Sequence, residues 1–151
     1  MIYLKRSLEA ELPLFVEMET DQEVKNYIHS YSLEQHRLVF DQENSHYLTI
    51  MCDREVIGFF LLVMSLDDCQ SVEFRRIVIR PRGQGFGQKA IAEMEIFCAA
   101  ELKVRRIWLD VYEHNERGRH LYHKLGYSEF KTSIRAEEGD LLFFEKMIAS
   151  Y

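Results

Sequence analysis

The chain of 151 residues has only two prolines, one tryptophan and three cysteines, and these scarcities exclude several classes of protein. Few prolines and no low-complexity tract argue against a disordered chain. Three widely spaced cysteines, Cys52, Cys69 and Cys98, do not make a disulfide framework, so we expect reduced thiols. Because 47% of the residues are apolar, the chain can bury a core of its own. We therefore expect one domain over residues 1–151.

A long hydrophobic run is also missing. The longest, Val56 to Met64 with Gly58 inside it, is far shorter than the roughly 20 residues of a membrane-spanning helix. The first residues, Met1 to Glu11, lack the apolar stretch and small-residue cleavage site of a secretory signal. These absences predict a cytoplasmic protein that does not bind membranes.

Basic residues are fewer than acidic ones, which gives a formal net charge of -6 and a sequence pI near 5.5. A broad nucleic-acid surface would need a basic face, so we expect no nucleic-acid partner. The acidic balance mildly favours a cationic partner.

The most informative stretch runs from Ser71 to Ala90, S-V-E-F-R-R-I-V-I-R-P-R-G-Q-G-F-G-Q-K-A. Its first half, rich in β-branched and aromatic residues and stopped by Pro81, predicts a strand. Three alternating glycines follow, Gly83, Gly85 and Gly87, and a helix is expected from Gln88. A glycine turn with outward N–H groups at a helix N-terminus is typical of an anion site.

Arg80, Arg82 and Lys89 add positive charge that suits phosphate oxygens, so we interpret the turn as a diphosphate site. The kinase-type phosphate loop is excluded because no hydroxyl follows the lysine. The dinucleotide fingerprint needs Gly-x-Gly-x-x-Gly, and the glycines here are one residue too close.

Two motifs resemble the GNAT superfamily of N-acetyltransferases. The first is Arg82-Gly83-Gln84-Gly85-Phe86-Gly87, which resembles the Arg-x-x-Gly-x-Gly signature that holds the pyrophosphate of acetyl-CoA. The second begins at Asn115, after a predicted strand, and continues seven residues later with Tyr122 and then Leu125-Gly126-Tyr127. The two motifs occur in the order and at the separation that the superfamily shows.

This resemblance implies acetyl-CoA as cosubstrate and a set of residues that bind it. The set is Ile77, Val78, Ile79, Arg80, Arg82, Gly83, Gln84, Gly85, Phe86, Gly87, Gln88, Lys89, Asn115 and Tyr122. Main-chain groups at Ile77 to Ile79 would pair with the pantetheine as an added strand does. The resemblance also makes Tyr122 the acid that protonates the leaving thiolate, because a phenol with a pKa near 10 can pass its proton to a thiolate whose conjugate acid has a pKa of about 8.5. A tyrosine that only packs in the core is the alternative.

Attack by an amine needs a base, since an alkyl ammonium has a pKa of about 10. Glu73 is the first candidate and Asp110 the second, each at a position where a branch of the superfamily carries its base. An aspartate is one methylene shorter than the glutamate found there. Alternatively, each carboxylate only faces solvent or forms an ion pair, and Arg75 lies close enough to neutralise Glu73.

The remaining pattern predicts an α/β (α+β three-layer) fold with a mixed, largely antiparallel sheet of six to seven strands and helices on both faces, similar to the GNAT fold. The expected strands are 2–6, 46–52, 55–64, 71–79, 106–112, 127–134 and 141–147, and the expected helices are 9–18, 21–31, a short turn after Ser32, and one from 88. Asp53 and Arg54 are expected to form a hairpin turn.

The sequence does not identify the acceptor. His29, Tyr27 and Tyr31 fall in the region that forms the acceptor wall of the resembling fold, beside an acidic run of Glu9, Glu11, Glu17, Glu19, Asp21 and Glu23. A polyamine or a protein amino group would suit that wall, although a solvated helix face is the simpler explanation of the run. His114, His120 and His123 have no Cys or carboxylate at ligand spacing, so we expect no metal.

The sequence thus favours an acetyl-CoA-dependent N-acetyltransferase, monomeric or homodimeric, that acts by direct transfer in a ternary complex. An acetyl-CoA sensor without turnover is the main alternative. A dinucleotide binder with Asp110 on the ribose is a weaker one, because the glycine spacing and the second motif argue against it.

Overall fold

The computed structural model describes residues 1–21, 29–80, 84–134 and 139–148. All of its strands join one seven-stranded sheet in the order β1-β2-β3-β4-β5-β7-β6. The strands are β1 (Ile2–Arg6), β2 (Ser45–Cys52), β3 (Glu55–Met64), β4 (Ser71–Ile79), β5 (Arg106–Tyr112), β6 (Ser128–Ser133) and β7 (Leu141–Met147). The helices are the 3-10 turn η1 (Glu9–Glu11), α1 (Leu12–Glu19), α3 (Leu33–Phe40), α4 (Phe86–Ala100) and α5 (Glu116–Lys124).

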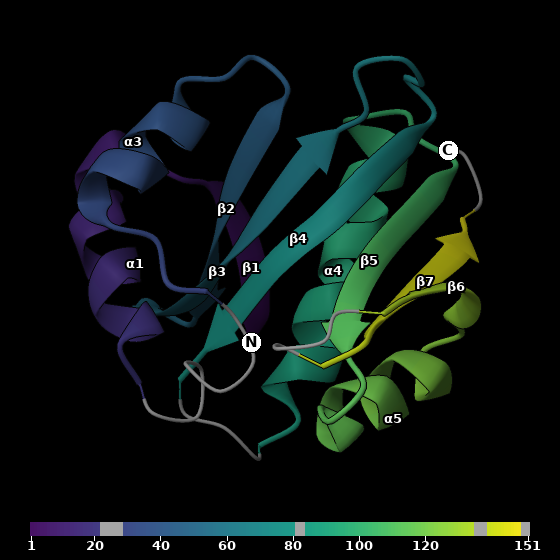
Figure 1. Ribbon diagram of the computed structural model, residues 1–151. Helices are drawn as coiled ribbons and strands as arrows, with labels where there is room; N and C mark the ends of the chain where they lie inside the picture. The colour runs from purple at the N-terminus through teal and green to yellow at the C-terminus, as the bar shows by residue number, and fades with distance from the viewer. Residues whose placement is uncertain (22–28, 81–83, 135–138, 149–151) are drawn as a thin grey trace.

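The predicted fold class is confirmed. Only β4 and β5 run parallel, and every other neighbouring pair is antiparallel. Helix α4 provides the crossover between the parallel strands, which need a connection long enough to return along the sheet. Figure 1 shows α1 and α3 beside the β1–β4 half and α4 against the opposite face.

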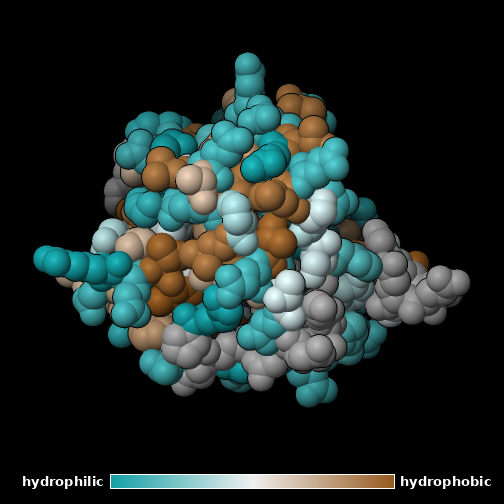
Figure 2. All heavy atoms as spheres, turned by 90° about the vertical axis from the view of Figure 1, so that its left-hand side faces the viewer, coloured by the Kyte–Doolittle hydropathy of each residue, from teal (hydrophilic) through white to brown (hydrophobic). Residues whose placement is uncertain are grey.

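Two apolar cores, one on each face, fix the helices to the sheet. The first joins α4 to the sheet through buried residues such as Ile91, Met94, Phe74, Leu109 and Phe144. The second lies under α1 and contains Phe15, Tyr47, Phe59, Leu61 and Val78. Figure 2 shows the side of α1 and α3, where apolar patches lie at the surface among polar side chains. The core residues Phe15, Phe59 and Leu61 are themselves fully buried.

The feature of the sheet that matters most for function is the short contact between its two parallel strands. β3 pairs with β4 as far as Ile79, and β5 pairs with β7 as far as Tyr112. β4 and β5 themselves pair only at Ser71–Glu73 with Arg106–Trp108. Beyond these three residues, no ladder joins the described parts of the two strands, and they separate.

A β-bulge in β4 accompanies the separation. Leu61 of β3 is opposite Arg76 while Leu62 is opposite Phe74, so Arg75 is the extra residue. A bulge changes which side chains share a face. Phe74 therefore points into the core under α4, whereas Arg76 contacts α1 on the other face.

Several local predictions need correction or completion. Helix α4 begins at Phe86, and the expected start at Gln88 is wrong because Gly85, at φ 74°, already turns the chain into the helix. Ser32 caps a helix of eight residues, α3, through a capping box with Gln35. The expected helix 21–31 falls mostly outside the described residues. Asp53 takes the left-handed conformation that the predicted hairpin turn requires, at φ 55°.

No helix in the described parts of the chain is long and apolar enough to cross a membrane. The cytoplasmic location stays a prediction.

Gly58 of β3 allows the close approach of β3 to β4 near the end of β4. A Cβ at this position would lie 1.9 Å from the carbonyl oxygen of Val78. We expect Gly58→Ala to lower the free energy of unfolding by about 3 kcal/mol, since β3 and β4 would have to move apart. Chemical denaturation measures the effect. Gly87→Ala is the matched control, because its Cβ would meet only Leu121 Cδ2 at 3.8 Å. Equal stability of the two variants would contradict the close strand approach.

Candidate functional site

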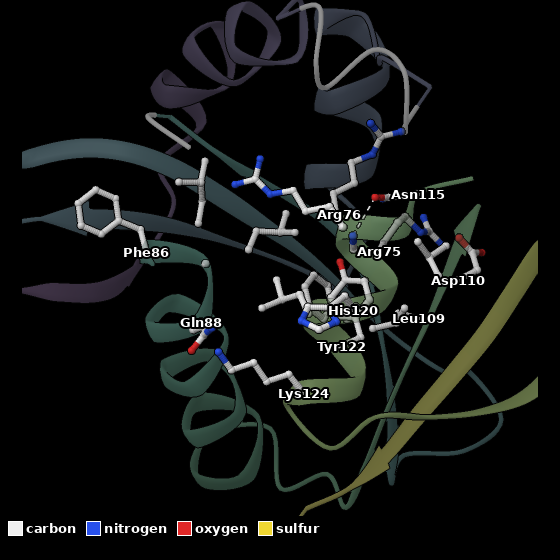
Figure 3. Close-up of a pocket in the computed structure, with 18 of the residues that line it drawn as sticks. Arg75, Arg76, Phe86, Gln88, Leu109, Asp110, Asn115, His120, Tyr122 and Lys124 are labelled. Carbon is white, nitrogen blue, oxygen red and sulfur yellow. Dashed lines mark hydrogen bonds between the residues drawn. The ribbon is translucent and has the colours of Figure 1, made fainter. Parts of the chain in front are cut away.

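A cleft of about 430 Å³ opens where β4 and β5 separate. Its walls come from four elements that are distant in sequence, namely β4, the start of α4, the end of β5, and α5. Figure 3 shows side chains from these elements converging on the same space. The cleft therefore joins the two predicted motifs, which the sequence separates by about thirty residues.

The start of α4 forms one wall. Gly85, Phe86, Gly87 and Gln88, four of the residues assigned to the cofactor, line the cleft. A Cβ on Gly85 would have no heavy atom within 4 Å, so the backbone here faces open space. The first-turn N–H groups of a helix lack intrahelical partners and favour an anion. Gly87 lies within the first turn of the helix and not in the preceding loop, and Arg82 and Gly83 fall outside the described residues.

Helix α5 forms the facing wall. Its N-cap is Asn115, whose Oδ1 accepts a hydrogen bond of 2.9 Å from the N–H of Gly118, the dashed line in Figure 3. A Cβ on Gly118 would lie 2.7 Å from Asn115 Nδ2, so a side chain here would displace the Asn115 cap. The predicted Asn115 thus lines the cleft and also fixes the helix that carries Tyr122.

Two cationic side chains on α5, Arg117 and Lys124, were not predicted from the sequence. With His120 they line the cleft at three- and four-residue spacings, which place the three on one helix face. Figure 3 shows Lys124 reaching from α5 toward Gln88 of α4. The spacing alone was a usable signal, and together these groups can neutralise phosphate oxygens.

The other predicted cofactor residues differ in position. Ile77 and Ile79 line the cleft. The side chain of Val78 instead packs in the second core, and the N–H of Arg80 donates to the Ile57 carbonyl at 2.7 Å. Gln84 is exposed and is not among the lining residues, and Lys89 lines a separate hollow near the N-terminus.

Tyr122 both packs on the core and lines the cleft, so the structural and the catalytic explanation of this residue are compatible. Its ring packs edge-on against Phe74 at a centroid distance of 5.9 Å and against Tyr127 at 6.0 Å. It also lines the cleft, on the α5 side (Figure 3). Packing on a closed core therefore fixes the ring while part of the residue stays at the cleft.

The two candidate bases lie in different environments. Glu73 Oε1 accepts a hydrogen bond from Arg75 Nη2 at 2.8 Å, its side chain is 15% exposed, and it is not among the lining residues. Burial lowers the pKa of Arg75, but the hydrogen bond and charge of Glu73 outweigh it and leave that pKa raised. Asp110 is exposed and lines the cleft.

A buried polar network supports the β4 wall from behind. Arg76 Nη1 donates to Glu19 Oε2 at 2.6 Å, and His36 Nε2 is 2.6 Å from Glu19 Oε1. His36 Nδ1 is 2.6 Å from the hydroxyl of Tyr47, whose pKa is raised by burial. Glu19 and His36 are fully buried. The simple explanation of the acidic run as a solvated face is therefore wrong at Glu19.

The same arginine holds the segment that leads into α3. Arg76 Nη2 donates to the carbonyl of His29 at 2.6 Å, and its guanidinium lies 3.6 Å from the ring centroid of Tyr31. His29 Nε2 is 3.2 Å from the hydroxyl of Tyr112 on β5. His29 and Tyr31 thus contact residues of β4 and β5, the strands that border the cleft, but neither is among the lining residues. Their place in an acceptor wall stays a prediction, and Tyr27 and Glu23 are outside the described residues.

The three histidines that are close together in the sequence have different neighbours in the structure. His120 lines the cleft, His114 stacks on Tyr112 with centroids 5.2 Å apart, and His123 packs against Phe144 at 4.9 Å. Within the described residues, no three His, Cys, Asp or Glu side chains converge as metal ligands.

The family model of the acetyltransferase (GNAT) family matches residues 12–127 of the chain. Among solved structures, the chain is similar to spermidine N-acetyltransferase from Vibrio cholerae in complex with CoA and spermine. The TM-score is 0.83 at 18% identity, over 97% of this chain and 95% of that one. It is also similar to aminoglycoside acetyltransferase AAC(6')-Ib in complex with coenzyme A, with a TM-score of 0.81 at 16% identity over 97% and 95% of the two chains. At these identities the likeness to the solved structures shows the shared fold.

The buried network leads to a stability prediction. Glu19→Gln leaves the guanidinium of Arg76 buried without its carboxylate, so we expect the free energy of unfolding to fall by about 3 to 5 kcal/mol. Glu17→Gln, on an exposed position of the same helix, is the control and should change it little. Denaturant unfolding of both variants provides the measurement. A Glu19→Gln protein as stable as the control would show that the network does not hold α1 to β4.

Proposed function

This chain belongs to the acetyltransferase (GNAT) family and is an acetyl-CoA-dependent N-acetyltransferase, and from this premise we propose that it transfers the acetyl group directly to a primary amine within the cleft between β4 and β5. The observation that supports the site is the early end of pairing between these strands, which leaves one edge of β4 without a ladder opposite the start of α4. No covalent acetyl-enzyme is required.

The residues of the cleft fit the cosubstrate. The edge of β4 beyond Glu73 offers main-chain groups to an extended amide chain such as pantetheine, as an added strand would. The α4 start, with Gly85 facing open space, suits the pyrophosphate. Arg117 and Lys124 suit the remaining phosphate. Acetyl-CoA, when bound, supplies an acetyl group activated as a thioester.

The reaction removes two protons from the nitrogen of the ammonium and gives one to sulfur. The ammonium first loses a proton, the neutral amine nitrogen bonds to the acetyl carbon, and the carbon–sulfur bond breaks. The nitrogen then loses its second proton and the departing thiolate gains one, so one proton is released in total. We assign proton removal from nitrogen to Asp110, directly or through water, and protonation of sulfur to Tyr122. Backbone N–H groups of the open β4 edge stabilise the charge that develops on the carbonyl oxygen.

Asp110 is the better base for a structural reason. A base must reach the amine, and Asp110 lines the cleft whereas Glu73 does not. Oε1 of Glu73 already accepts two hydrogen bonds from Arg75, from Nε at 3.2 Å and from Nη2 at 2.8 Å, so this oxygen is held by the guanidinium. We therefore reverse the order that the sequence suggested and keep Glu73 as the residue that positions Arg75.

The similar structures are of enzymes named for spermidine and for aminoglycosides. Both are amines, which supports a small amine as the acceptor here. A monomer or a homodimer is the assembly that we propose.

Thiol release from acetyl-CoA in the presence of different primary amines tests the proposal. We expect turnover with at least one amine, and Tyr122→Phe should lower kcat about a hundredfold or more while the Kd for acetyl-CoA stays unchanged. Tight acetyl-CoA binding without thiol release for any amine would support the sensor alternative. A Tyr122→Phe loss of binding equal to the loss of turnover would show that the ring has a structural role only.

The choice of base has its own test. Asp110→Asn should lower kcat/KM about a hundredfold at pH 7, and the loss should shrink above the pKa of the amine, where the neutral nucleophile is abundant without a base. Glu73→Gln is the matched control and should stay within a few fold of the unaltered enzyme. A larger effect of Glu73→Gln than of Asp110→Asn across the pH profile would restore Glu73 as the base.

A further inference from the structure

Three aromatic rings form a continuous row across the last strands of the sheet. Trp108 of β5 stacks on Phe143 of β7, with centroids 6.2 Å apart and an interplanar angle of 28°. Phe130 of β6 meets Phe143 edge-on at 6.2 Å. Trp108 and Phe143 are half-buried and Phe130 is 42% exposed. We refer to Trp108, Phe143 and Phe130 as the aromatic row.

The aromatic row lies on the same face of the sheet as α1 and α3, but beyond the area that these helices cover. Ile107 and Leu109 of β5 are in the core under α4, so Trp108 and Asp110 point to the opposite face. The core under α1 and α3 takes its strand residues from β2, β3 and β4, and neither Trp108 nor Phe143 belongs to it. No described helix covers the rings, although two long cationic side chains lie over them, Lys131 Nζ at 5.0 Å from the ring centroid of Phe143 and Arg106 Cζ at 5.0 Å from that of Phe130.

The aromatic row lies next to Asp110, the residue to which we assigned the role of base. Asp110 is directly opposite Phe143 in the β5–β7 ladder, so the two are one strand spacing apart, about 5 Å. Trp108 is on the same strand face, two residues before Asp110. An aryl group carried two carbons from an amine nitrogen spans a similar distance. A nitrogen at Asp110 would thus place its aryl group over Phe143 and Trp108.

The paired carboxylates on this face do not favour an acceptor with several positive charges. Glu73 pairs with Arg75, Glu145 with Arg106 at 2.7 Å, and Glu19 with Arg76. Each of these carboxylates is matched by a guanidinium. A polyamine binds best where several carboxylates are available to its cations, and the described part of this face does not provide that arrangement.

We propose that the aromatic row binds the apolar group of the acceptor, and that the preferred acceptor is an arylalkyl primary amine. This inference rests on the proposed function and deepens it. The aryl group loses its contact with water on the rings of Trp108 and Phe143, while the amine reaches the cleft beside Asp110. The earlier expectation of a polyamine or a protein amino group is replaced by this narrower class.

The experiment compares three amines in the thiol-release assay: 2-phenylethylamine, n-propylamine, which has the same amine without the ring, and spermidine. We expect kcat/KM for 2-phenylethylamine to exceed that for either of the others about tenfold or more, as burial of a ring would give. Trp108→Ala should raise KM for 2-phenylethylamine about tenfold. The kinetics with n-propylamine and the Kd for acetyl-CoA should not change, and these separate a lost contact from a damaged fold.

Tyr3→Ala is the matched control, because Tyr3 is an exposed aromatic on β1 at the opposite edge of the sheet. It should leave all three amines unaffected. If kcat/KM for n-propylamine or spermidine equals or exceeds that for 2-phenylethylamine, the inference is wrong while the proposed function stands. If no amine releases thiol, both fail. If Trp108→Ala only converts a dimer to a monomer in sedimentation and leaves amine selectivity intact, the row is a subunit interface and the inference is overturned.

Discussion

The structure depends on one constraint, the end of pairing between β4 and β5 after Glu73 and Trp108. Two parallel strands that continued side by side would satisfy each other's main-chain groups and leave no cleft. Each strand is instead held by its other neighbour, β4 by β3 and β5 by β7, so the sheet stays continuous while its centre opens. Rings of Phe74 and Tyr122 pack at the opening and stabilise it from the α5 side.

The buried network on the other face serves the same geometry. Arg76 follows the bulge in β4, and its contacts with Glu19 and the His29 carbonyl hold the strand toward α1 and away from β5. Because Arg76 also lines the cleft, this network connects the second core with the reaction space. A buried ion pair is a costly way to stabilise a fold. Its presence here is explained by the position that it imposes on β4.

The sequence predicted local features well and distant contacts poorly. Strand β5 and the residue limits of β3 followed from β-branched runs and turns. The glycine turn before α4 was also predicted, but the start of the helix was placed two residues too late. The burial of Glu19 could not be predicted, because its partner Arg76 is 57 residues away in the sequence. The bulge in β4 also changes the face of the sheet to which the Arg76 side chain points. The choice between Glu73 and Asp110 likewise depends on which strand edge faces the cleft. Arg117 and Lys124 were missed, although their spacing from His120 on a helix is visible in the sequence.

The two faces of the sheet differ in charge, so the cleft favours different ligands on its two sides. On the α4 and α5 side, the helix N-terminus and the cations of α5 favour an anion. On the opposite side, arginines are neutralised by carboxylates, and Asp110 lines the opening. An anionic cosubstrate and a cationic acceptor would therefore approach the same gap from opposite faces of the sheet. The net charge of -6 averages over both faces and conceals this arrangement, which only the fold reveals.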